Sequence, residues 1–118
     1  MKNFRDLIVW QRSHQLLLGV YSATKLFPKE ELYSLTAQLR RAVLPVGSNI
    51  AEGFKRNYPK ESGRFYNMAA ASLEEVKYQL LVAKDLEYLS HIQYQKLEAE
   101  ADEVGRLLHG WIKSQRMS

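Results

Sequence analysis

The chain has 118 residues, no cysteine, and 17 Lys and Arg against 13 Asp and Glu, which gives a net charge of +4. This length suits one domain, residues 1–118, whose core needs no disulfide or metal. The missing cysteine excludes a disulfide scaffold, a cysteine-ligated zinc site and a thiol nucleophile. No stretch has the roughly 18 to 20 apolar residues that a membrane span needs. We therefore expect a soluble, mildly basic, cytoplasmic protein with no membrane partner.

Helical hydrophobic spacing divides the first half of the chain into two predicted helices, about 5–26 and about 29–53. Pro28 separates them, because it disfavours helical geometry at the residue before it. The first helix is apolar on two opposite sides, so we expect a second subunit to cover one of them. Pro45 removes a backbone donor inside the second helix, which predicts a kink or a break near it. Gly53 is expected to end that helix.

The second half of the chain predicts two more helices, about 61–89 and about 91–115. The small side chains of Ala69 to Ser72 allow a neighbouring helix to approach the third helix closely. Ser90 is a good N-cap for the fourth helix. No segment shows the alternation of a strand. The predicted fold is therefore all-α, an antiparallel up-down-up-down four-helix bundle with a kinked second helix.

Two stretches of the second predicted helix, Gln38 to Val43 and Ser48 to Gly53 (SNIAEG), resemble the signature of the proteins encoded in 23S rRNA intervening sequences. Further matches at the start of the chain (Phe4 to Trp10), at the first turn (Phe27 to Glu31) and in the third predicted helix (Ala70 to Glu75) extend the resemblance over nearly the whole chain. One difference is that Gly47 precedes Ser48, where the family often has proline. The resemblance implies a left-handed four-helix bundle that assembles into a ring, a homopentamer. A related protein, the accessory variability determinant of diversity-generating retroelements, binds nucleic acid and a reverse transcriptase.

The sequence contains no arrangement of residues that indicates catalysis. Its histidines, His14, His91 and His109, fall on different predicted helices without a nucleophile turn. None has a glutamate three residues before it, as a di-iron bundle requires, and no glycine-rich phosphate loop is present. We expect no enzyme activity, no metal and no cofactor. His14 lies in the apolar stripe of its helix and is expected to be a hydrogen-bonded histidine at the edge of the core.

The SNIAEG stretch supports a structural interpretation and a functional one. Arg41, Ser48 and Glu52 share a face of the predicted helix, with Asn49 nearer the core. We expect these four residues to form a polar network that pairs Arg41 with Glu52 or with a neighbouring helix and fixes the bundle register. A ligand-binding or catalytic site built around Glu52 is the alternative.

A basic patch is the clearer indication of function. Residues 36–66 contain six Lys and Arg against two Glu, so this segment carries a charge equal to the whole net charge of +4, while the chain from His91 onward is balanced at four against four. The candidate nucleic-acid-binding residues are Arg40, Lys55, Arg56, Lys60 and Arg64. Tyr58 lies among them, and cations around an aromatic ring are typical of nucleic-acid-binding surfaces. An ordinary solvated loop is the alternative.

These observations favour a non-catalytic, homo-oligomeric bundle that binds RNA or DNA, structured RNA first, through a basic surface repeated around a ring. No motif for reading a base sequence is present, so shape and charge are expected to drive binding. The alternative function is an assembly or scaffold module that docks a protein partner, in which the basic residues only keep the protein soluble.

Overall fold

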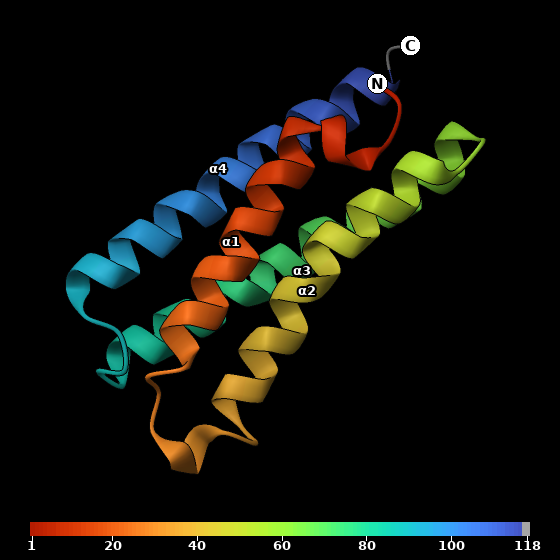
Figure 1. The fold of residues 1–118 in the computed structure, drawn as a ribbon. Coiled ribbons are helices and arrows are strands. Elements are labelled where there is room, and N and C mark those ends of the chain that lie inside the picture. Colours follow the sequence, from red (N-terminus) through yellow and green to blue (C-terminus); the bar gives the residue numbers. More distant parts are fainter. Residues whose placement is uncertain (117–118) are drawn as a thin grey trace.

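The computed structural model describes residues 1–116, which form four α-helices and contain no strand. The helices are α1 (Ile8–Thr24), α2 (Leu35–Lys55), α3 (Pro59–Asp85) and α4 (His91–Arg116). Two short 3-10 turns complete the fold, η1 (Phe4–Asp6) before α1 and η2 (Lys29–Glu31) between α1 and α2. The bundle is elongated, with extents of 46 × 25 × 21 Å. The N-terminus, the last turns of α4 and the α2–α3 connection lie at the same end of it (Figure 1). The prediction of an all-α, four-helix fold is confirmed.

Local sequence signals explain where the helices begin. Ser90 caps α4 as predicted, because its hydroxyl accepts a hydrogen bond from the Gln93 backbone N–H (3.1 Å) while Gln93 Oε1 accepts one from the Ser90 N–H (2.9 Å). Pro59 is the first residue of α3, a position that suits a residue without an N–H. Asn3 caps η1, so α1 begins at Ile8, three residues later than the sequence predicts.

Helix α2 differs from its prediction at two points. It continues through Pro45 as one helix, so the predicted break is wrong, while a bend at Pro45 stays a prediction. It also continues past Gly53 to Lys55. Gly53 has a packing role instead, because a Cβ placed there would lie 2.5 Å from Cε1 of the buried Tyr66 ring. The missing side chain therefore lets α2 lie against α3 just below the connection between them.

All four helices contribute to one core that runs along the bundle. Leu16, Val43, Val76 and Val104, one from each helix, are almost completely buried. Ala69 is also fully buried, consistent with the close approach predicted for this part of α3. His14 departs from its prediction, because it is exposed and its ring stacks on Trp10 at a centroid distance of 5.1 Å. None of the described helices has the length and apolar character that crossing a membrane requires.

Candidate nucleic-acid interface

Four of the five predicted nucleic-acid-binding residues gather around the α2–α3 connection. Lys55 is the last residue of α2, Arg56 follows it, and Lys60 and Arg64 lie on the first two turns of α3. All four side chains are exposed. The prediction placed these residues together because they are close in sequence, and the short connection keeps them together in space.

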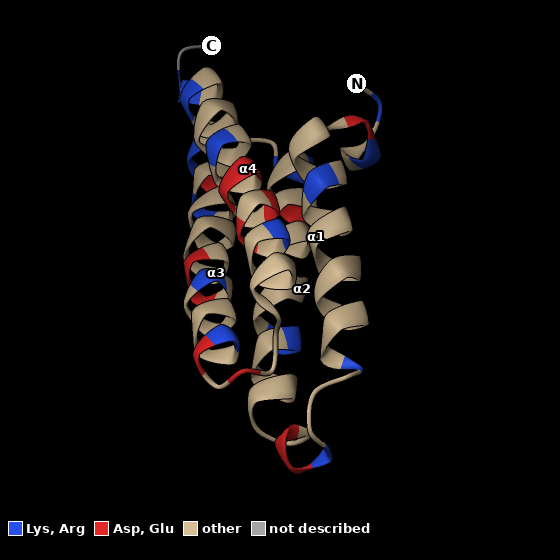
Figure 2. Ribbon diagram, turned by 90° about the vertical axis from the view of Figure 1, so that its left-hand side faces the viewer, with Lys and Arg blue, Asp and Glu red and all other residues tan. Residues whose placement is uncertain are grey.

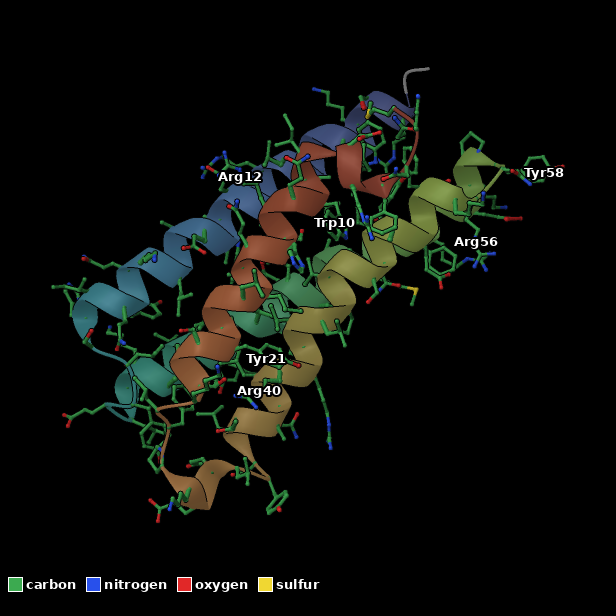
Figure 3. All side chains as sticks on the ribbon, in the orientation of Figure 1. Trp10, Arg12, Tyr21, Arg40, Arg56 and Tyr58 are labelled. Atoms are coloured by element: carbon green, nitrogen blue, oxygen red, sulfur yellow. The ribbon has the colours of Figure 1, made fainter. Side chains whose placement is uncertain are left out.

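Arg40 does not belong to this group. It lies about 22 Å from Lys55 along α2, because each helical residue rises about 1.5 Å. Its Nε donates a 2.9 Å hydrogen bond to Thr24 Oγ1, and its guanidinium lies 4.7 Å from the centroid of the Tyr21 ring. Figure 3 shows Arg40 beside Tyr21 and far from Arg56. Arg40 therefore ties α2 to α1, and the structure separates it from the candidate interface.

The four remaining cations differ in how firmly they are held. Arg56 forms a 2.8 Å ion pair with Glu52, and its guanidinium lies 4.5 Å from the centroid of the Phe65 ring. The side chains of Lys55, Lys60 and Arg64 form no ion pair or hydrogen bond within the part of the chain that the structure describes. Arg56 is thus fixed against the bundle, whereas its three neighbours present unpaired charges.

Two other segments extend the basic surface beyond the predicted residues. A depression of about 530 Å³ joins Phe4 of η1 to Lys55 and Arg56. A second depression, of about 450 Å³, joins Lys60 and Arg64 of α3 to Arg116 at the end of α4. The N-terminal turn and the last turns of α4 therefore lie beside the α2–α3 connection.

Together these segments concentrate positive charge at one end of the bundle. We call residues 1–6, 52–64 and 106–116 the basic end. It holds nine Lys and Arg against three Asp and Glu, a net charge of +6, so the rest of the chain carries −2. In Figure 2 several blue segments lie at the end that holds the N-terminus and the last turns of α4, whereas red segments lie along the middle of α3 and α4 and at the other end.

One of the three acidic residues at the basic end has a structural role. Asp6 Oδ2 accepts hydrogen bonds from the backbone N–H of Lys2 (2.7 Å) and of Asn3 (3.3 Å). These bonds to the ionised carboxyl lower the pKa of Asp6 below its usual range. The carboxylate is therefore occupied in holding η1, the turn that carries Arg5 and follows Lys2.

The profile of the family described as 23S rRNA-intervening sequence protein matches residues 5–110. The chain belongs to this family. Its fold is similar to that of a Bacteroides thetaiotaomicron VPI-5482 protein described as having unknown function and belonging to the S23 ribosomal protein family, in a crystal structure at 1.70 Å resolution. The TM-score is 0.83 with 22% identity, over 90% of this chain and 99% of that chain, so this likeness shows the fold alone. A comparison with curated proteins gives no match.

In this member of the 23S rRNA-intervening sequence protein family, the SNIAEG residues do not form the predicted polar network. Glu52 pairs with Arg56, and the Ser48 hydroxyl donates a 2.9 Å hydrogen bond to the Leu44 carbonyl of its own helix. Arg41 is exposed and Asn49 half-buried, and neither forms a side-chain hydrogen bond or ion pair within residues 1–116. The physical reason is distance, because a shared helical face still leaves Arg41 and Glu52 about 16 Å apart along α2.

Proposed function

We propose that this protein binds nucleic acid without catalysis, through its basic end, and that structured RNA is the preferred ligand. One observation carries the proposal: three segments far apart in the sequence meet as a surface of charge +6 on a chain of charge +4. Most of its cations have no acidic partner among the described residues. These are Lys2, Arg5, Lys55, Lys60, Arg64, Arg106, Lys113 and Arg116.

Unpaired cations on an exposed surface bind phosphates mainly by releasing the counterions that surround nucleic acid. Each neutralised phosphate adds about 0.7 to 0.9 to the slope of log affinity against log salt. The sequence carries no motif for reading base edges, so affinity is expected to depend on shape and charge more than on sequence. Folded RNA suits such a surface because its loops present phosphates and bases together.

The proposal includes assembly of the up-down-up-down bundle into a homo-oligomeric ring, with a pentamer expected. Large apolar side chains support assembly, because they are exposed on the outside of the helices where a second copy would cover them. Among them are Leu44 on α2 and Met68 and Tyr78 on α3, which are 55%, 48% and 66% exposed. A ring would place several basic ends side by side and sum their fields.

A protein-docking scaffold is the second candidate function, and a different observation favours it. The end of the bundle opposite the basic end exposes further large apolar side chains. Leu26, Tyr33 and Ile92 are 78%, 91% and 78% exposed. Such residues suit contact with a protein partner, in which case the basic end would only aid solubility.

Fluorescence anisotropy with a labelled RNA stem-loop and a labelled DNA duplex, at two salt concentrations, tests the proposal. The test variant reverses three unpaired charges at the basic end, Lys55→Glu, Lys60→Glu and Arg64→Glu. We expect it to weaken binding about tenfold or more at low salt and to flatten the salt slope.

The matched control reverses three unpaired, exposed lysines elsewhere, Lys25→Glu, Lys29→Glu and Lys96→Glu. It changes the net charge by the same amount and should bind far more tightly than the test variant. Equal losses in both variants would show that total charge matters and not the basic end. Absence of binding at low salt would favour the scaffold. Light scattering on the wild-type chain tests the ring, and a monomer would contradict it.

A further inference from the structure

Tyr58 is the most prominent aromatic side chain of the basic end. It lies between Arg56 and Pro59 at the tip of the α2–α3 connection and is 66% exposed. Its side chain forms no hydrogen bond and no ring contact within residues 1–116, and only its backbone carbonyl is bonded, by the Ser62 N–H (3.0 Å). Figure 3 shows its ring pointing away from the bundle, beyond Arg56. A large exposed ring with no partner is available to a ligand.

Several other tyrosines of the chain have partners. Tyr21 lies under the Arg40 guanidinium and Tyr66 is buried. The hydroxyls of Tyr88 and Tyr94 donate to Glu31 and Glu98 at 2.7 and 2.6 Å. Tyr33 and Tyr78 are exposed like Tyr58, but neither belongs to the basic end. Tyr58 therefore differs from the other tyrosines because it combines a free ring with surrounding cations.

The connection holds Tyr58 in a defined conformation. Its backbone is extended, with φ −120° and ψ 135°, and it directly precedes Pro59, which disfavours the helical alternative at this position. Arg56, two residues earlier, is held by Glu52 and Phe65. These restraints reduce the backbone freedom that Tyr58 loses when a ligand binds, which favours affinity.

We infer that Tyr58 stacks on an unpaired base, so that the basic end binds single-stranded nucleic acid, including the loops of a folded RNA. This inference rests on the proposed function and narrows its ligand. The bases of a duplex are stacked on each other and offer no free face to Tyr58, whereas an unpaired base does. Lys55, Lys60 and Arg64 would bind the phosphates on either side of that base.

The test compares the wild-type full chain with Tyr58→Ala and Tyr58→Phe, using a labelled oligouridine RNA, the DNA of matching length and a duplex. Loss of one stacking contact is expected to weaken single-strand binding roughly 5- to 150-fold in Tyr58→Ala. Tyr58→Phe keeps the ring and should retain wild-type affinity. Duplex affinity and the salt slope should not change, because no charge is altered. Equal effects with RNA and DNA would show that the 2′-hydroxyl is not read.

Tyr33→Ala is the matched control, since Tyr33 is exposed but lies outside the basic end, and it should bind normally. A 2-aminopurine base in the probe gives a direct readout, because stacking quenches its fluorescence in the wild type and in Tyr58→Phe but not in Tyr58→Ala.

The outcomes separate this inference from the proposed function. If Tyr58→Ala binds single strands normally while the triple charge reversal at Lys55, Lys60 and Arg64 does not, stacking is overturned and the proposed function stands. If duplex binding falls as much as single-strand binding in Tyr58→Ala, the ligand class is wrong. If the wild type binds no probe at low salt, both proposals fail.

Discussion

The two ends of the bundle use their charged side chains in opposite ways. At the end formed by the α1–α2 and α3–α4 connections, Glu31 accepts hydrogen bonds from the Ser34 hydroxyl (2.5 Å), the Leu35 N–H (3.3 Å) and the Tyr88 hydroxyl (2.7 Å). At the basic end most cations have no partner within the described chain. At one end the Glu31 carboxylate therefore joins the connections to each other, while at the other end most cations face outward without a partner.

The largest effect that we expect is a loss of stability when the packing of Gly53 beneath the basic end is disturbed. Gly53→Ala places a Cβ against the buried Tyr66 ring, which cannot move aside easily, and should destabilise the fold by about 1–3 kcal/mol. Gly63→Ala is its control, because nothing lies within 4 Å of the added Cβ. That half-buried helical site has room for the methyl group and should gain about 0.5–1 kcal/mol. Urea unfolding of both variants measures the difference, and equal effects would show that Gly53 has no packing role.

Arg40 lies on α2, as Lys55 does, but its contacts indicate that it stabilises the fold and does not bind the ligand. Arg40→Ala removes the hydrogen bond to Thr24 and the contact with the Tyr21 ring, and should cost about 1–2 kcal/mol of unfolding free energy. RNA affinity measured by anisotropy should stay close to wild type. A large loss of RNA affinity at unchanged stability would show that Arg40 belongs to the candidate interface after all.

The hydrogen bonds to Glu31 should make the stability of the opposite end depend on pH. They lower the pKa of Glu31 below its usual 4.5, with Ser34 as the largest cause and Tyr88 next. Their contribution is therefore complete above about pH 4.5 and is lost as the pH falls through the lowered pKa. Glu31→Gln should melt below the wild type at pH 7, and the gap should shrink at pH 3 in melting curves followed by circular dichroism. A gap independent of pH would exclude this role.

The smallest effect concerns Glu52, whose ion pair with Arg56 is exposed. Such pairs contribute little to stability, so Glu52→Gln should leave the melting curve almost unchanged. It removes a negative charge from the basic end and frees Arg56, so we expect RNA binding at low salt to tighten a few fold. Unchanged affinity would indicate that this side of the connection does not meet phosphate.

The sequence predicts the helices well because their signals are local. Hydrophobic spacing locates all four, and Ser90 with Gln93 marks the start of α4 through bonds between near neighbours. The predictions fail where tertiary packing decides the structure. A proline ends many helices, but α2 continues through Pro45 while its apolar side packs along the core. Gly53 was predicted to end α2, but it is needed there because the Tyr66 ring packs against it.

The interface was predictable only in part. Counting charges along the sequence identified Lys55, Arg56, Lys60 and Arg64, because they are close to each other in the chain. The same count also included Arg40, whose partners lie on α1. The α4 contribution was missed because His91 onward is balanced overall. Counting charges separately in the first and second halves of that stretch would have revealed it. All its acidic residues fall within 98–103, whereas Arg106, Lys113 and Arg116 follow them. The contribution of η1 requires knowing that the first residues lie beside the end of α2.

The shared position of the N-terminus and the last turns of α4 has a practical consequence for any assay. An affinity tag or fluorescent protein fused to either side of the described residues would be tethered at the end of the bundle that holds the α2–α3 connection (Figure 1). An acidic tag would neutralise the basic end, and a bulky fusion would shield its surface. Labels are better attached at the η2 connection, for example by a Tyr33→Cys change, since Tyr33 is exposed and distant from the basic end. Because the chain has no cysteine, that thiol would be unique.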